Sequence, residues 1–218
     1  MADLPLFPLN TVLFPGMQLK LHIFEERYKI MINECLNQQK PVGIVLIKNG
    51  LEASAPLAEP CEIGCAAQIT EVQRLQFDRM NIVATGQHRF RINHIKKHEP
   101  YLLADVDEFS PIDDNPNLIA RYAELLHPII EQYIKILSQV SDMPFNPLQI
   151  PHNPRSLAHV ASVLLQSENP LKQDLLSTTH LSLLLRKLLD IYQLETMLLQ
   201  IRISPPDDSF NIGSFSSN

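Results

Sequence analysis

Residues 4–36, LPLFPLNTVLFPGMQLKLHIFEERYKIMINECL, contain the signals that decide the fold of this chain. The dipeptide Pro15-Gly16 predicts a turn within a proline-rich apolar run. After the turn, apolar and polar residues alternate over 19–23, which is the period of a half-buried strand. The spacing then changes to three and four residues, which predicts a helix with Glu25-Glu26 in its first turn, where the helix dipole favours carboxylates. The apolar positions of this helix are Phe24, Tyr28, Met31, Ile32, Cys35 and Leu36.

Further segments downstream have the short apolar or alternating patterns of strands. Four of them lie at 42–47, 63–69, 81–86 and 102–107, and a fifth begins directly after Gly86. We expect the strand at 81–86 to end at Gly86 and a separate strand to begin there, with Phe90 and Ile92 on one side. Several short strands with one early helix predict a closed or partly closed barrel.

The composition changes at 110–117, SPIDDNPN, and a helical period follows. Three Asn-Pro pairs, at 115, 153 and 169, predict helix starts because asparagine is a good N-cap and proline is tolerated in the first turn. A long last helix is expected from Thr178 or Thr179. Pro128 is expected to kink the first of these helices or to split it after His127. The stripe predicted to be buried on that helix is Leu118, Tyr122, Leu125, Ile129, Tyr133 and Ile136.

These patterns divide the chain into three parts. We expect a β-rich unit over 1–112, a helical bundle over 113–203 and a disordered polar tail over 204–218, rich in Ser, Asp and Pro. The predicted fold class is therefore α+β, with a β barrel and an early helix before an α-helical bundle.

Composition excludes several classes of protein. A net charge of −6 disfavours nucleic acid and anionic membranes as partners. Three cysteines fit a reducing compartment better than a disulfide framework. The N-terminus lacks the pattern of a signal peptide, and no apolar run reaches the roughly 18 residues of a membrane-spanning helix. We therefore expect a cytoplasmic protein.

Two groups of residues have the types, but not the arrangement, of chemical sites. Asp174, Ser177 and His180 include the residue types of a catalytic triad, but we expect them at a helix start, where serine acts as a cap. Cys61 and Cys65 have no second cysteine pair to complete a zinc site, and Cys65 fits a buried strand position. We predict no catalytic residue, no metal site and no cofactor.

Four segments in order resemble the substrate-binding domain at the N-terminus of the Lon (La) protease family. They are 4–36, then EIGCAAQITEVQRL at 62–75, NIVATGQHRFRI at 81–92 and LKQDLLSTTHLSLLLRKLLDIYQLETMLL at 171–199. The resemblance covers residues 4 to about 200. It implies a PUA-like pseudo-barrel followed by a helical bundle, and it implies a domain that binds protein.

Lon proteases carry an ATPase module and a Ser-Lys peptidase module after this domain, and this chain is expected to lack both. The phosphate-binding pattern G-x-x-x-x-G-K-[ST] does not occur, and there is no Gly-Lys dipeptide. The resemblance therefore points to a non-enzymatic adaptor or chaperone-like protein that binds unfolded or apolar polypeptide segments. A protease or a chaperone is a candidate partner, and the sequence leaves open whether the protein works with one.

Two candidate binding surfaces follow from the residues. Leu13, Phe14 and Met17 flank the Pro15-Gly16 turn, where apolar side chains mark a protein-binding surface or close the end of the barrel. The alternative function is RNA binding by a PUA-like module. It would use the basic segment 87–98, which contains no acidic residue and carries Arg89, Arg91, Lys96 and Lys97.

Overall fold

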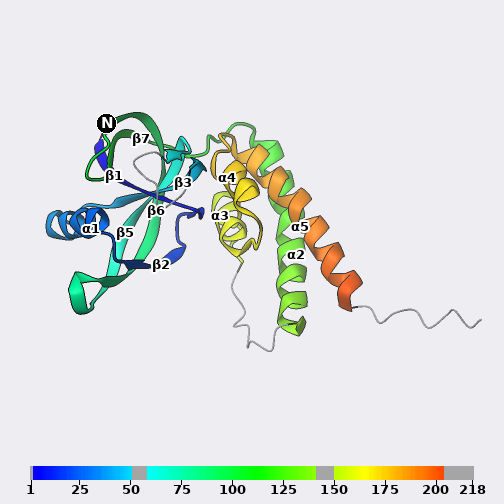
Figure 1. Cartoon of the computed structure of the whole chain (residues 1–218). Coiled ribbons are helices and arrows are strands. Elements are labelled where there is room, and N and C mark those ends of the chain that lie inside the picture. The colour runs from blue at the N-terminus through cyan, green and yellow to red at the C-terminus, as the bar shows by residue number, and fades with distance from the viewer. Residues whose placement is uncertain (1, 51–57, 141–149, 204–218) are drawn as a thin grey trace, which may run out of the picture.

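The computed structural model describes residues 2–50, 58–140 and 150–203, in which the strands and α1 form one part of the molecule and helices α2–α5 the other (Figure 1). The strands are β1 Ala2–Leu9, β2 Gln18–Ile23, β3 Val42–Asn49, β4 Glu59–Pro60, β5 Ile63–Arg74, β6 Met80–Lys97 and β7 Leu102–Glu108. The helices are α1 Glu26–Gln38, α2 Pro116–Val140, α3 Pro154–Leu164, α4 Asn169–Leu176 and α5 Leu181–Ile203. The predicted α+β class is confirmed.

Five strands close into a ring. β1 pairs with β7 on one side and, in parallel, with β3 on the other, and β6 and β5 complete the circle. All five strands contribute to one apolar cluster, which therefore fills the ring. Its members are Leu4, Leu6, Val45, Ala66, Phe90, Leu102, Ala104 and Val106. The predicted pseudo-barrel is confirmed.

The Pro15-Gly16 turn forms as predicted and packs against the middle of β6. Phe14 O accepts the amide of Met17 at 3.1 Å, and Gly16 has φ 81°, which gives a type II turn. Gly16 N donates to Gly86 O at 2.8 Å, and Gly86 N donates to Met17 O at 2.9 Å. The prediction that a strand ends at Gly86 is wrong, because this glycine lies inside the 18-residue strand β6 and receives the turn there.

A bulge next to Gly86 changes which side chains of β6 face each side. Ala67 pairs with Gly86 and Ala66 with His88, so Gln87 has no partner in β5. The even-numbered residues of β6 before the bulge, such as Ala84, therefore lie on the same face of the strand as Arg89 after it. Arg89 faces the helices and Phe90 the ring interior, and both are buried because both faces of β6 are covered here.

Helix α1 covers the face of the sheet opposite the ring interior. Its side chains Tyr28, Met31, Ile32 and Cys35 are buried in a second apolar cluster with residues of β1, β3, β5 and β6, as the spacing predicts. Phe24 is different, since 60% of its surface is exposed. It precedes the N-cap residue Glu25, so the helical period does not determine where it points.

Helix α2 buries a face that lies one residue away from the predicted one. Of the predicted stripe, Tyr133 and Ile136 are buried, but Leu118 and Leu125 are exposed. The residues buried instead are Ile119, Ala123, Leu126 and Ile130. Both sets have the helical spacing, so periodicity alone could not choose between them. The helix also continues through Pro128, so the predicted split after His127 does not occur.

Two of the three predicted Asn-Pro caps are confirmed. Asn115 accepts the amides of Asn117 and Leu118 at the start of α2, and Asn153 accepts those of Arg155 and Ser156 at the start of α3. The third is wrong: the N-cap of α4 is Glu168, and Asn169 instead donates to Asn10 O at 2.8 Å.

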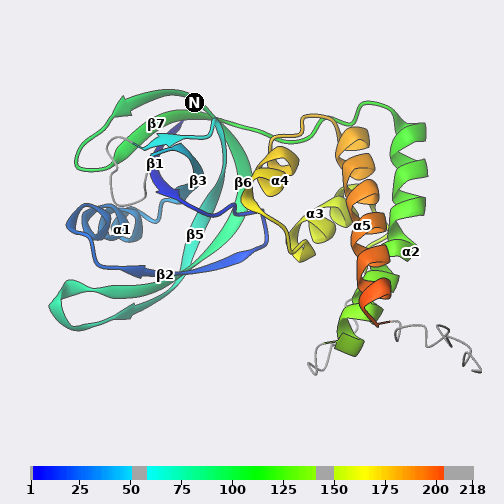
Figure 2. The same ribbon diagram turned by 45° about the vertical axis from the view of Figure 1, so that its right-hand side comes forward.

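The last helix begins at Leu181 rather than at Thr178 or Thr179. Asp114, in the segment between β7 and α2, accepts both the amide and the hydroxyl of Ser182. The same segment pairs with the start of α5, where Leu181 N donates to Ile112 O at 2.9 Å. The starts of α2 and α5 therefore lie next to each other, and the two long helices run side by side. Helices α3 and α4 lie between these two helices and the strands (Figures 1 and 2).

The boundary between 1–112 and 113–203 stays a prediction, although the last strand ends at Glu108 and α2 begins at Pro116. The tail predicted at 204–218 lies outside the described residues. Among the residues that are described, no helix is both long and apolar enough to cross a bilayer.

Two adjacent leucines of α2 test which face is buried. We expect Leu126→Ala, at a side chain with 0% exposure, to lower the free energy of unfolding by about 2–5 kcal/mol through lost burial and a cavity. Leu125→Ala, at 47% exposure, should cost less than about 1 kcal/mol. Urea denaturation of both variants measures the difference. Equal costs would contradict the burial described here.

Candidate functional site

Strand β2 has one open edge. It pairs with the first half of β6, from Gln18 opposite Thr85 to Ile23 opposite Met80. Within the described residues β2 has no second partner strand. Backbone amide and carbonyl groups along such an edge are available to a further strand.

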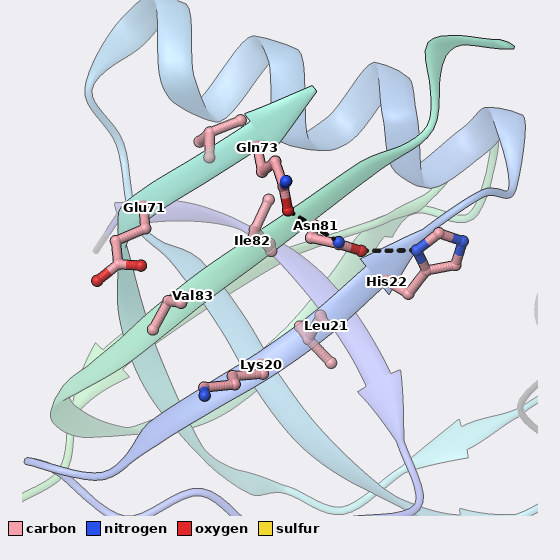
Figure 3. Close-up of a pocket in the computed structure, with 9 residues that line it drawn as sticks. Lys20, Leu21, His22, Glu71, Gln73, Asn81, Ile82 and Val83 are labelled. Carbon is pink, nitrogen blue, oxygen red and sulfur yellow. Dashed lines mark hydrogen bonds between the residues drawn. The ribbon is translucent and has the colours of Figure 1, made fainter. Parts of the chain in front are cut away.

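A shallow groove of about 510 Å³ crosses the outer face of β2, β6 and β5 (Figure 3). Its floor carries a polar ladder across the three strands. His22 Nδ1 lies 2.7 Å from Asn81 Oδ1, and Asn81 Nδ2 donates to Gln73 Oε1 at 3.2 Å. Lys20 and Glu71 lie farther along the same groove (Figure 3). The face can therefore form hydrogen bonds with polar groups laid across it.

A second hollow, of about 250 Å³, lies along the open edge of β2 and is mostly apolar. It lies between β1, β2 and the start of α1. Its apolar lining is Phe7, Leu9, Leu21, Ile23, Phe24 and Tyr28. Phe24 is the exposed member, and its ring stacks on His22 with centroids 6.0 Å apart. We call this hollow together with the open edge of β2 the β2 edge site.

The hairpin between β5 and β6 extends beyond the ring at the same end of the molecule (Figure 2). Its tip presents Phe77, which is 80% exposed and has φ 59°, a region that a non-glycine residue seldom adopts. The Lys29 ammonium donates to Phe77 O at 3.3 Å and ties the tip to α1. Because Ile23 pairs with Met80, Phe24 lies near this tip, so two exposed aromatic rings lie at one end of the sheet.

The apolar residues predicted to bind protein lie inside the molecule. Leu13 and Phe14 are buried, Leu13 in the cluster beneath α1 and Phe14 in the cluster of the helices. Met17 is partly buried, and its sulfur accepts the Phe14 amide at 3.4 Å. These positions fit the alternative in which the three side chains close the end of the barrel. A protein-binding role for them stays a prediction.

The basic residues predicted for RNA have partners within the protein. Arg89 is buried and donates to Leu176 O. Arg91 lies over the ring of Phe109 at 4.9 Å, and Lys97 lies 5.7 Å from the ring of Tyr101. Lys96 pairs with Asp3 at 2.5 Å and lies 3.8 Å from Asp105. The acidic partners come from β1 and β7, which the sequence pattern of segment 87–98 could not reveal.

The residues that have the types of a catalytic triad each bind a different neighbour, and among the described residues the cysteines form no metal site. Asp174 pairs with Lys187 at 2.6 Å, Ser177 accepts from Gln173, and His180 Nδ1 lies 3.0 Å from the Thr179 hydroxyl. Cys65 is buried, as predicted, and burial raises the pKa of its thiol to about 12. Among the described residues, no three His, Cys, Asp or Glu side chains are close enough to hold a metal ion.

Sequence reasoning missed the two exposed aromatic residues. The helical period places Phe24 on the buried stripe of α1, and no strand or helix pattern marks Phe77. The segment 75–80, LQFDRM, carried a usable signal, because it joins two strands and places an aromatic residue beside an aspartate in the turn.

Over residues 3–193, the sequence matches the family of ATP-dependent protease La (LON) substrate-binding domains. It is 26% identical over 206 residues to a Lon protease of Parabacteroides distasonis, which covers 92% of this chain and 25% of that protease. It is also 26% identical over 144 residues to a Lon protease of Flavobacterium johnsoniae, which covers 66% of this chain and 18% of that protease. The chain thus spans a quarter or less of the length of these two relatives.

Two solved structures share the fold. The crystal structure of a Lon N-terminal domain protein from Xanthomonas campestris has a TM-score of 0.58 at 23% identity, covering 87% of this chain and 98% of the other. The N-terminal domain of a Mycobacterium avium complex Lon protease has a TM-score of 0.62 at 19% identity, covering 88% and 98%. The match over most of the sequence and the shared fold agree, and the chain belongs to the Lon substrate-binding domain family.

Proposed function

We propose that this protein binds unfolded or apolar polypeptide segments at the β2 edge site, as an adaptor or chaperone-like module. A bound segment would add a strand to the open edge of β2, so that main-chain hydrogen bonds supply affinity without a sequence requirement. The observation that carries the proposal is that the open edge of β2 lies beside an apolar hollow and the exposed ring of Phe24.

The chemistry of the site suits segments of varied sequence. Apolar side chains of a bound strand would enter the hollow, and fully burying one such side chain is worth about 1.5–3 kcal/mol before the costs of association. Polar side chains on the other face of the added strand would lie toward solvent and toward the polar groove around His22 and Asn81. A short segment would therefore bind weakly and reversibly.

We further propose that residues 1–218 bind polypeptide without themselves hydrolysing ATP or peptide bonds, and that a protease or chaperone acts on the bound polypeptide in the cytoplasm. The sequence contains no phosphate-binding pattern of the kind that ATPases use. Family membership supports protein binding in general, and the proposal adds the site and the role.

Phe24→Ser tests the site with little risk to the fold, because 60% of this side chain is already exposed. We expect roughly a 5- to 30-fold weaker affinity for a permanently unfolded polypeptide such as reduced, carboxymethylated casein, since about 1–2 kcal/mol of apolar burial is lost. Fluorescence anisotropy with labelled casein measures the affinity.

The matched control is Ile201→Ser on α5, which has the same 60% exposure and lies far along the chain from the β2 edge site. Its affinity should equal that of the wild type. Hydrogen exchange provides a second measurement, because added casein should protect amides of Gln18–Ile23 if a strand is added there. Equal binding by all three proteins would contradict the proposed site, and unprotected β2 amides would contradict strand addition.

Salt dependence distinguishes the proposal from RNA binding through the basic segment. Capture of casein should persist or strengthen in sodium sulfate, because this salt favours apolar burial. The double variant Arg91→Ala/Lys97→Ala should leave that capture unchanged. Binding of a single-stranded RNA that falls steeply with salt and is lost in the double variant would favour the alternative function.

A further inference from the structure

A cavity of about 190 Å³ lies where the ring meets the helices, away from the β2 edge site. The Pro15 turn, β6, the segment after β7, α3 and α5 all contribute to its wall. Arg89 and Arg155 line it, with His88 and His159, and none of its lining residues is acidic. The cavity therefore brings two guanidinium groups from separate parts of the chain to one small space.

Arg89 is a buried cation without a carboxylate partner. Only 7% of its surface is exposed, and its one side-chain hydrogen bond within the described residues goes from Nη1 to Leu176 O at 3.0 Å. Burial lowers the pKa of this guanidinium to about 10, and the charge of Arg155 acts in the same direction. Guanidinium has five N–H donors, so most of its capacity remains for another acceptor.

The bond to Leu176 explains part of this burial. The acceptor is the last residue of α4, where the helix dipole favours a cation. A carbonyl carries no net charge, however, and a buried cation is normally compensated by a full negative charge. The space beside Arg89 is hollow, and no side chain of the residues that the structure describes fills it.

Arg155 approaches the same cavity from α3. Its Nη2 donates to Pro111 O at 2.9 Å and to Asp113 Oδ1 at 2.7 Å, which fixes the guanidinium at the rim. Asp113 pairs with Arg155 but does not itself line the cavity, so among the described residues Arg89 is the guanidinium there without a carboxylate partner. His159 forms part of the wall, and burial followed by the charge of Arg89 lowers the pKa of its imidazole.

We propose that this junction cavity binds a phosphate group between Arg89 and Arg155. Guanidinium groups bind phosphate oxygens with paired, charge-assisted hydrogen bonds. The cavity volume of about 190 Å³ is several times the roughly 30 Å³ that one water molecule occupies, so a phosphate group fits. A bound anion would also join the two parts of the molecule, because Arg89 belongs to the ring and Arg155 to the helices.

Calorimetric titration with inorganic phosphate at constant ionic strength tests the proposal. We expect saturable binding to the wild type and an increase of roughly tenfold or more in Kd for Arg155→Gln, since a charge-assisted contact is lost. The control Arg121→Gln changes an exposed arginine on α2 outside the cavity and should bind as the wild type does. Phosphoserine in a second arm distinguishes free phosphate from a phosphate carried on a larger molecule, and either ligand supports the site.

Two further measurements keep the test decisive if a variant is destabilised. In the wild type, the Arg89 Nε–H resonance should shift with phosphate along the same isotherm. Arg89→Met, if circular dichroism shows that it is folded, should lose binding as well. No saturable binding by the wild type, or equal binding by the wild type and Arg155→Gln, would overturn the proposal.

Discussion

The close approach of the Phe14 backbone to Gly86 determines how the two parts of the molecule are joined. A Cβ atom at residue 86 would lie 2.4 Å from Phe14 O, so no side chain fits there. Two backbone hydrogen bonds, between Gly16 and Gly86 and between Gly86 and Met17, hold the turn in place. With the turn fixed, Leu13 points into the cluster beneath α1 and Phe14 into the cluster of the helices. This turn thus connects the cluster beneath α1 with the cluster of the helices.

Strand β6 transmits this constraint to both candidate sites. Before Gly86 it pairs with β2, which leaves the outer edge of β2 open. After Gly86 it pairs with β7 and closes the ring. The bulge at Gln87 lies between these halves and turns Arg89 toward the helices, where a regular strand would have placed it on the face shared with Ala66. A single long strand therefore supports the proposed polypeptide site at one end and the basic cavity at its middle.

The sequence was sufficient for those elements whose signals are local. The Pro15-Gly16 turn depends on the backbone preferences of its own residues, and at Asn115 and Asn153 the capping side chain accepts backbone amides only two or three residues away. Sequence patterns gave wrong predictions where contact with a distant segment determines the local structure. Gly86 suggests a strand end until the turn at Phe14 is known to pack on it. Leu125 and Leu126 both fit a helical stripe, and the packing of α2 against α5 and α3 selects Leu126. Phe24 and Phe77 are exposed because of tertiary positions that have no periodic signature.

An open strand edge beside apolar surface is a risk for a soluble protein, because it can pair with any exposed strand. β2 limits that risk with polar side chains on its outer face, among them Lys20 and His22, and with its short length of six residues. The hollow next to it remains apolar, so a passing segment gains both hydrogen bonds and burial only when it lies along the edge in an extended form. Folded proteins rarely present such a segment, whereas unfolded chains do so continually. Under the proposed function, this compromise between solubility and adhesion would select for unfolded polypeptide without any reading of its sequence.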